Sequence, residues 1–154
     1  MPSVSLVVLK SLRRLRLLRG GGVLGEFPVA LGGNWAADKS VEGDHATPEG
    51  DFYVCAKNPQ SKYFLSLCLS YPNVEDAARG LGAGLIDLRE HDLITAAITA
   101  GKIPPQHTRL GGEIYIHGGG SGRDWTRGCI ALDDAAMQEV YVLAAIGTPV
   151  RILG

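Results

Sequence analysis

The sequence predicts a mainly β fold with a few short helices, and two observations carry this prediction. Its 154 residues include 21 glycines and 8 prolines, a content that indicates many tight turns. Short apolar runs bounded by such residues recur along most of the chain and are typical of strands. Hydrophobic residues at 45% and charged residues at 20% are ordinary values for a globular protein. We therefore expect one mixed, mainly β domain over residues 1–154.

The first half of the chain is predicted to form five strands. Apolar runs place these strands at residues 4–9, 15–18, 27–31, 52–56 and 63–70. Asn58 and Pro59 supply a turn between the last two. The polar stretch GGNWAADKSVEGDHATPEG separates the third strand from the fourth. It is too long for a hairpin turn and is therefore a candidate functional loop.

The second half is predicted to contain three helices and three strands. The expected helices cover residues 74–79, 89–100 and 133–145. Asn73 is placed to cap the first of them. The third has the strongest signal, because Asp133 and Asp134 stand at its positive N-terminal end and its apolar residues fall on one face. The expected strands cover residues 113–117, 129–132 and 149–153.

The charge pattern gives no sign of a nucleic-acid partner or a transmembrane segment. The formal net charge is -1, and no apolar run approaches the roughly 20 residues of a membrane-spanning helix. In MPSVSLVVLKSLRRLRLLRG the apolar part precedes the basic part, the reverse of a secretory signal. We interpret this run as two strands with arginines on their outer faces, in preference to a basic patch for anionic partners. The sequence shows no recognisable export signal, so we expect either that the protein stays in the cytosol or that a leader is missing.

Three cysteines without CxxC spacing leave at least one without an intramolecular partner. Cys55 and Cys68 lie in strand-like runs and are interpreted as buried structural residues, with a bridge between them left open. Cys129 differs, because it ends a glycine-rich loop that His117 precedes. A phosphate loop would need a lysine and a hydroxyl after the glycines, and the other histidines are scattered singly, so neither a phosphate site nor a metal site is expected.

His117 and Cys129 predict nucleophilic catalysis by a thiol. A cysteine attacks as thiolate, and a nearby imidazole is the usual means of forming one at neutral pH. The loop GGGSGRDWTRG can fold back so that the two residues meet. Gly128 would let backbone N–H groups near the thiol face a substrate carbonyl. The alternative is that His117 is a hydrogen-bonded strand-end residue and Cys129 a buried apolar one.

The stretch HGGGSGRDWTRGCIAL resembles the signature of the L,D-transpeptidase (YkuD-type) catalytic domain, in which a histidine precedes a loop ending in Ser/Thr-x-Gly-Cys. The segments FPVALGGN, EGDHATPEGDFYV, SYPN, GGEIYIHG and GTPVRI occur in the order typical of the branch that carries Asp-Trp-Thr-x-Gly-Cys. The resemblance covers nearly the whole chain. It implies a β-sandwich-like catalytic fold that holds a cysteine nucleophile in a cleft on one sheet.

The resemblance also implies a role for each catalytic residue. Cys129 would attack the carbonyl of the penultimate residue in a peptidoglycan tetrapeptide stem, with His117 as its base and the Gly118 carbonyl orienting the imidazole. Terminal D-alanine would leave, and an amine of a second stem would take the acyl group. No metal or organic cofactor is implied. Carbapenem-type β-lactams are expected to acylate Cys129.

Further motif residues are expected to bind substrate or shape the cleft. They are Glu49, Tyr71, Asn73, Trp125, Thr126 and Arg127. Packing and helix capping are alternative roles for Tyr71 and Asn73. The commoner family motif reads Ser-His-Gly-Cys with an arginine two residues later, so no family role carries over to Arg127 or Ala131. Arg127 either lowers the thiol pKa, binds a stem carboxylate or is a solvated loop residue, and Arg123 has the same ambiguity.

Three functions are compatible with this sequence. The first is a peptidoglycan L,D-transpeptidase. The second is a hydrolase, either an L,D-carboxypeptidase or an endopeptidase, in which water takes the acyl group. The third is a non-catalytic murein-binding module with an unreactive Cys129. The family implies the bacterial periplasm or cell envelope, which conflicts with the absence of an export signal.

Overall fold

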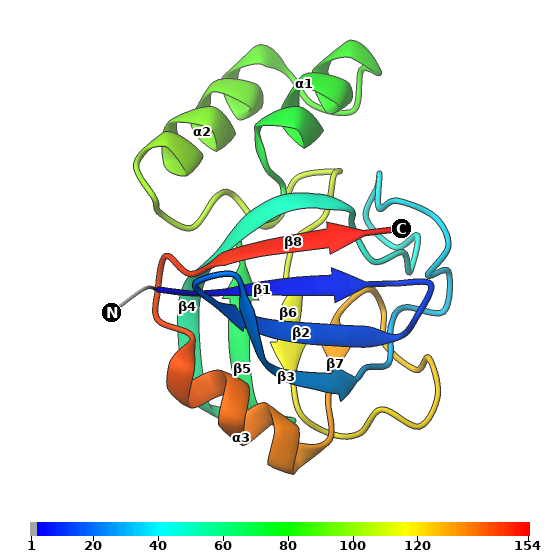
Figure 1. Cartoon of the computed structure of the whole chain (residues 1–154). Coiled ribbons are helices and arrows are strands. Elements are labelled where there is room, and N and C mark those ends of the chain that lie inside the picture. The colour runs from blue at the N-terminus through cyan, green and yellow to red at the C-terminus, as the bar shows by residue number, and fades with distance from the viewer. Residues whose placement is uncertain (1–2) are drawn as a thin grey trace.

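A computed structural model describes residues 3–154, which form one curled eight-stranded sheet and three helices (Figure 1). The spatial order of the strands is β3-β2-β1-β8-β4-β5-β6-β7. Their bounds are β1 Val4–Leu9, β2 Arg14–Arg19, β3 Gly22–Pro28, β4 Gly50–Ser61, β5 Phe64–Leu69, β6 Tyr115–His117, β7 Ile130–Ala131 and β8 Pro149–Leu153. The pairs β1/β8 and β6/β7 are parallel and the others antiparallel. The prediction of a mainly β fold is confirmed.

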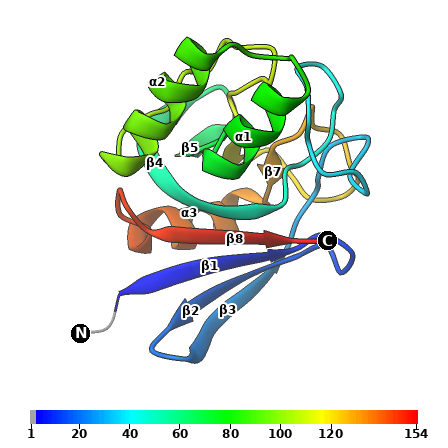
Figure 2. The ribbon, with the colours of Figure 1, turned by 90° about the horizontal axis from the view of Figure 1, so that it is seen from above.

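The long strand β4 joins the two halves of this sheet. Its first residues pair with β8, from Gly50 opposite Ile152 to Tyr53 opposite Pro149. From Val54 onward it pairs with β5 instead. Figure 2 shows β4 curving from the layer of β8, β1, β2 and β3 towards β5. A bridge between Ala30 and Ala131 ties the chain after β3 to β7, the far edge of the sheet.

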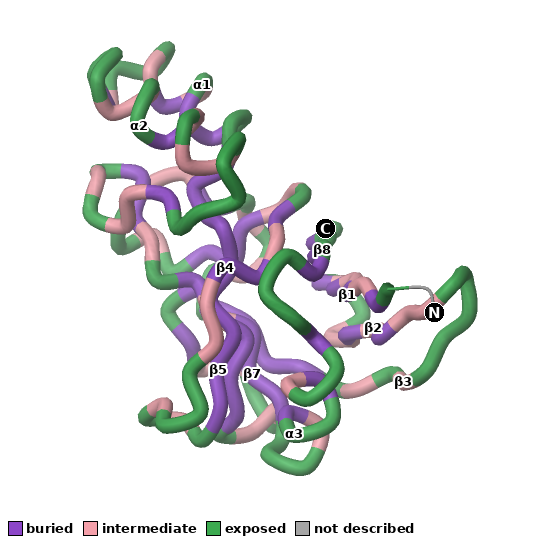
Figure 3. The backbone as a smooth tube through the Cα atoms, turned by 90° about the vertical axis from the view of Figure 1, so that its left-hand side faces the viewer, coloured by how far each residue is buried: buried purple, intermediate pink, exposed green. Residues whose placement is uncertain are grey.

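The core lies between the two halves and follows the alternation expected of strands. In β1, Val4, Leu6 and Val8 are buried while the residues between them are half-buried. Figure 3 shows that buried backbone gathers along β4, β5 and β7. One hydrophobic cluster takes residues from both halves, so each half covers apolar side chains of the other. Each such side chain contributes about 1.5–3 kcal/mol when it is fully buried.

Helices α1 (Val74–Gly82) and α2 (Leu88–Thr99) lie together at one end of the sheet, around a small core of their own (Figure 1). Both begin with capping boxes; in α1 the Asn73 side chain accepts from the Asp76 N–H and the Asp76 carboxylate accepts from the Asn73 N–H. Helix α3 (Asp134–Leu143) lies at the opposite end and buries Met137 and Val140. No helix in residues 3–154 has the length and apolar character needed to cross a membrane.

The expected strand at residues 27–31 is shifted, because β3 begins at Gly22 and ends at Pro28. Gly20 and Gly21 alone form the turn after β2, with φ of 56° and 83°, conformations that suit a two-residue hairpin. The strand therefore resumes at once. Gly25 interrupts the apolar pattern that sequence reasoning relied on, and the Phe27 ring packs over it.

The turn expected at Asn58 and Pro59 is also wrong, since β4 continues to Ser61 and Ser61 pairs with Phe64. A register shift falls between Asn58 and Ser61, and a proline without an N–H is tolerated at such an irregularity. The hairpin reverses at Lys62 and Tyr63 instead. Tyr63 therefore lies at the tip of the hairpin, beside His117.

Candidate active site

Strands β5, β6 and β7 present their polar and small side chains to one cleft. Ser66 pairs with His117 and Cys68 with Tyr115, and His117 pairs with Ala131 of β7. Residues opposite one another share a face of the sheet, and the period of two places Cys129, two residues before Ala131, on that face too. A cleft of about 940 Å³ is lined by Ser66, Cys68, Tyr115, His117 and Cys129, among other residues. The alternate residues Leu67, Ile116 and Ile130 face the core. Strand register therefore brings the imidazole and the thiol to one cleft.

His117 is held in the tautomer that a base requires. It is 4% exposed, and its Nδ1 lies 2.6 Å from the Gly118 carbonyl oxygen. Because a carbonyl only accepts, Nδ1 must carry the proton and Nε2 keeps its lone pair. Burial lowers the pKa of His117 below its usual value, although the bond to Gly118 opposes this effect. The imidazole is thus neutral and basic at neutral pH.

Two aromatic rings fix the orientation of this imidazole. Tyr63 stacks on it with ring centroids 4.7 Å apart and an interplanar angle of 24°. Trp125 meets it edge-on at 5.5 Å and donates from its indole nitrogen to the Gly120 carbonyl at 2.9 Å. Both rings line the cleft, so Trp125 forms part of its wall. Tyr63 is not among the predicted site residues, because the sequence placed the hairpin turn at Asn58 and Pro59 instead of at Lys62 and Tyr63.

Cys129 is half-buried and its thiol is free. The Tyr115 N–H donates to Sγ at 3.4 Å, and the thiol donates to the Glu113 carbonyl at the same distance. Burial raises the pKa of this thiol to about 11, while the Tyr115 N–H and the positive charge of Lys39 act in the opposite direction. The resting group is therefore a thiol rather than a thiolate. A base must remove its proton as it attacks.

The segment Asp-Trp-Thr-Arg-Gly-Cys is clamped by its own side chains. Thr126 is buried; its hydroxyl donates to the Cys129 carbonyl at 2.7 Å and accepts from the Gly128 N–H at 3.2 Å. Asp124 accepts from the Leu31 N–H at 3.0 Å and forms an ion pair with Arg13 at 2.7 Å. The Thr126 hydroxyl, which the sequence predicts to contact substrate, thus closes the loop that carries Cys129.

Gly128 allows this loop to approach the polar stretch at residues 32–49. Its φ is 132°, a conformation reserved for glycine, and a Cβ there would lie 2.7 Å from the Ala46 carbonyl oxygen. Because the Gly128 N–H already donates to Thr126, it is not free for a substrate. The donor that the sequence predicts would then come from a neighbouring backbone group, such as the N–H of Cys129.

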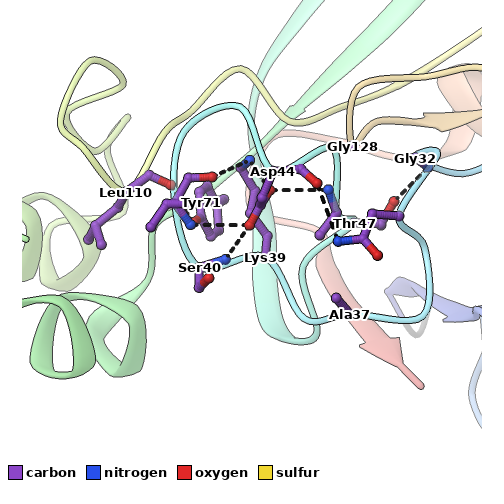
Figure 4. A network of polar contacts seen from close by, with 12 residues as sticks. Gly32, Ala37, Lys39, Ser40, Asp44, Thr47, Tyr71, Leu110 and Gly128 are labelled. Atoms are coloured by element: carbon purple, nitrogen blue, oxygen red, sulfur yellow. Dashed lines mark hydrogen bonds and ion pairs between the residues drawn. The ribbon is translucent and has the colours of Figure 1, made fainter. Parts of the chain in front are cut away.

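The polar stretch is itself tightly held. Figure 4 shows Asp44 between Lys39 and Ser40, with bonds of 2.9 and 2.8 Å, and the Thr47 hydroxyl bonded to the Gly32 N–H. Below it, the fully buried Lys10 ammonium donates to the Thr47 carbonyl at 2.6 Å and pairs with Glu49 at 3.0 Å. Glu49 therefore helps to hold the polar stretch in place, and it lines a second, smaller pocket with Asp38 and Asn73.

The remaining candidates lie in different surroundings. Tyr71 is fully buried, and its hydroxyl donates to the Leu110 carbonyl at 2.6 Å (Figure 4). Asn73 caps α1 and donates to the Asp51 carbonyl. These are the packing and capping roles that the sequence left open. Arg127 is exposed and lines the cleft with Cys129. Cys55 and Cys68 are both buried and free of a disulfide.

Comparison with known families now decides the assignment. The YkuD model, which describes the L,D-transpeptidase catalytic domain, matches residues 3–152. The chain belongs to this family. Curated protein sequences gave no significant match.

Several solved structures share the fold of this chain at low sequence identity. The helical cell shape determining protein Pgp2 (K307A mutant) from Campylobacter jejuni is 23% identical with a TM-score of 0.66, over 98% of this chain and 47% of that one. Bd1075 from Bdellovibrio bacteriovorus is 21% identical with a TM-score of 0.64, over 99% and 48%. LdtMt1 in complex with imipenem is 17% identical with a TM-score of 0.54, over 99% and 59%. This L,D-transpeptidase domain thus spans about half the length of the first two.

Proposed function

We propose that the chain is a peptidoglycan L,D-transpeptidase with Cys129 as nucleophile and His117 as base. One observation carries this proposal: strand register puts a free thiol and an imidazole with a bare Nε2 on the same face of one cleft. A buried structural cysteine would not need a base with a fixed tautomer. Family membership supports the same chemistry. The substrate is the tetrapeptide stem of peptidoglycan, and the place of action is the cell envelope.

The mechanism follows from the protonation states of the two groups. As the thiol attacks the L,D-peptide carbonyl, its proton passes to His117 Nε2 and a C–S bond forms. The oxyanion is received by the Cys129 N–H. His117 then gives the proton to the nitrogen of D-alanine, which leaves as the C–N bond breaks. An amine of a second stem attacks the thioester, and the thiol is regenerated.

The walls of the cleft supply the binding contacts in this proposal. Trp125 offers an apolar surface next to His117 for the stem peptide. Arg127 is placed to receive a stem carboxylate, because it is a solvent-exposed guanidinium on the same cleft. The structure of LdtMt1 is a complex with imipenem. By the same chemistry, a carbapenem would open its β-lactam ring on Cys129 and remain attached.

The test is mass spectrometry of protein and products after mixing with a disaccharide tetrapeptide, with and without an acceptor stem that lacks donor D-alanine. Released D-alanine plus cross-linked dimer is expected. Cys129→Ala should abolish both, whereas Cys68→Ala, which removes another thiol of the same cleft, should retain them. Tripeptide as the sole product would make the enzyme a carboxypeptidase. Unchanged stems with retained binding would indicate a murein-binding module.

A further inference from the structure

Glu113 lies next to Cys129 in the cleft and has no role in the proposed attack of Cys129 with His117 as base. Its backbone carbonyl accepts from the Cys129 thiol at 3.4 Å. Two residues later, the Tyr115 N–H donates to the same sulfur. Glu113 is exposed and lines the cleft together with Cys129 and His117. Glu113 therefore brings a carboxylate to the cleft in which the acyl-enzyme would form, and its charge acts on Cys129.

The backbone at Glu113 is held in a conformation that its side chain disfavours. Its φ is 56°, in the left-handed region that non-glycine residues seldom adopt. Gln106 fixes it by accepting from the Glu113 N–H at 2.7 Å, while its own amide donates to the Tyr71 carbonyl at 2.8 Å. A glycine would adopt such a φ without strain. Gly111, two residues earlier, does so with φ of 89°. His45 of the same cleft shares the φ of 56°, so the conformation alone assigns no role; together with the position of Glu113 beside Cys129 it supports a functional hypothesis.

The charge of Glu113 does not help the first half of the reaction. Burial is the largest cause of the raised pKa of Cys129, and the negative charge of Glu113 raises this pKa further. It also raises the pKa of Tyr115, which burial brings to about 12. Within residues 3–154 its carboxylate belongs to no salt bridge. By contrast, Lys39 of the same cleft is paired with Asp44. The cleft thus keeps a free negative charge that makes its own thiol harder to ionise.

We infer that Glu113 receives the ammonium group of the acyl acceptor and so favours aminolysis of the acyl-enzyme over its hydrolysis. This inference rests on the proposed transpeptidase function. An amine acceptor is a cation at neutral pH and is concentrated beside a carboxylate, whereas water is uncharged and gains nothing. The contribution belongs to the second half of the reaction, after the thiol has been consumed.

The chemical step balances in protons and bonds. The bound ammonium loses one proton to solvent, and its nitrogen attacks the thioester carbonyl. The C–N bond forms and the C–S bond breaks, with the bonding pair kept by sulfur. A second proton passes from nitrogen through His117 Nε2 to the Cys129 thiolate. Thioester and ammonium thus give amide, thiol and one released proton.

The experiment measures how the acyl-enzyme divides between amine and water. Full-length protein is given the tetrapeptide donor and increasing amounts of a tripeptide stem with a free side-chain amine, and cross-linked and hydrolysed products are quantified. In Glu113→Gln, the KM for the amine acceptor should rise about tenfold. D-alanine release in the first turnover, which reports acylation alone, should be no slower, because the neutral amide no longer opposes thiolate formation. Glu113→Asp should restore part of the wild-type KM.

Hydroxylamine, a nucleophile that is uncharged at neutral pH, separates charge recognition from structural damage. Its KM should be the same in wild-type and Glu113→Gln proteins. The matched control is Glu42→Gln, a second cleft carboxylate whose charge is not among those acting on Cys129. An unchanged amine KM in Glu113→Gln, or an equal loss for both nucleophiles, would overturn the inference. Failure of the wild-type protein to release D-alanine would instead overturn the proposed function on which it rests.

Discussion

Arg13 and Asp124, 111 residues apart in sequence, join the first hairpin to the loop that carries Cys129. The guanidinium donates through Nε at 3.0 and 3.2 Å and through NH2 at 2.7 Å to the carboxylate, and it lies 3.8 Å from the centre of the Trp35 ring. Both side chains are about a quarter exposed. The same carboxylate accepts from the Leu31 N–H. The loop that carries Cys129 is thus anchored to residues before the long polar stretch.

Asp124→Asn should therefore destabilise the protein by about 1 kcal/mol. Burial alone would raise the pKa of Asp124, but the bonds from Arg13 and Leu31 lower it below its ordinary value of 3.8. A carboxyl with a lowered folded-state pKa contributes stability above its ordinary pKa and loses it as the pH falls through the folded value. The free energy of unfolding, measured in urea between pH 7 and pH 3, should fall less steeply with decreasing pH in the variant than in the wild-type protein. An identical pH dependence in both proteins would mean that the ion pair contributes nothing to stability.

Gly128→Ala should abolish activity. It should also lower the free energy of unfolding by more than about 2 kcal/mol, towards the upper end of the range for single substitutions. The added Cβ would meet the Ala46 carbonyl oxygen at 2.7 Å, and φ is 132°. Gly122→Ala is the matched control in the same loop, because its Cβ would meet nothing within 4 Å. Urea unfolding and carbapenem acylation measured for both variants decide the point. Equal behaviour of the two glycine variants would contradict the close packing at Gly128.

The sequence specified much of this site, but only where local pattern was sufficient. The strand ending at His117 and the glycine loop before Cys129 were predictable, because strand alternation and loop composition are local signals. Tyr63 and Glu113 were not found. Tyr63 reaches His117 through the register between β5 and β6, and Glu113 through a left-handed turn held by Gln106. Such contacts depend on which strands and loops pack together in the fold. The spacing of residues along a single sequence does not reveal this.

The Asp133 and Asp134 side chains illustrate the same limit. Sequence reasoning placed them at the N-terminus of a helix to complement its dipole, and the structure begins α3 there. Asp133 makes no side-chain cap, however. It accepts instead from the Ser121 N–H and hydroxyl at 3.0 Å, and Asp134 accepts from the Gly119 N–H at 2.9 Å. The two carboxylates thus hold the glycine-rich loop, a task that helix propensity does not reveal.

Tyr63→Ala should slow acylation of Cys129, because the His117 imidazole would lose the ring that stacks on it at 4.7 Å. We expect a loss of about three- to tenfold in the acylation rate, the equivalent of one aromatic contact. Tyr63→Phe keeps the ring and should retain nearly the wild-type rate. The measurement is the rate of carbapenem adduct formation by mass spectrometry. Equal rates for Tyr63→Ala and Tyr63→Phe would show that the stacked ring does not contribute to acylation.

The protonation state of the resting catalytic pair can be read from alkylation. Burial raises the pKa of Cys129 from 9.0 to about 11 and lowers that of His117 from 6.5, so both shifts favour the neutral thiol and imidazole over the ion pair. The thiolate fraction is therefore small at pH 7 and grows as the pH rises towards 11. Iodoacetamide labelling of Cys129, resolved from Cys55 and Cys68 by peptide mass spectrometry, should accelerate through this range without a plateau near neutrality.

His117→Ala distinguishes the neutral pair from an ion pair at the same site. If the imidazole does not ionise the resting thiol, its removal should leave iodoacetamide labelling at pH 7 nearly unchanged. Carbapenem acylation by the same variant should fall about 10²–10⁴-fold, because that reaction needs the proton to move during attack. In wild-type protein acylation should decline on the acid side with a midpoint below 6.5, where His117 becomes protonated. A large drop in labelling for His117→Ala, together with a neutral plateau in the wild-type protein, would show instead that the thiol rests as a thiolate paired with imidazolium.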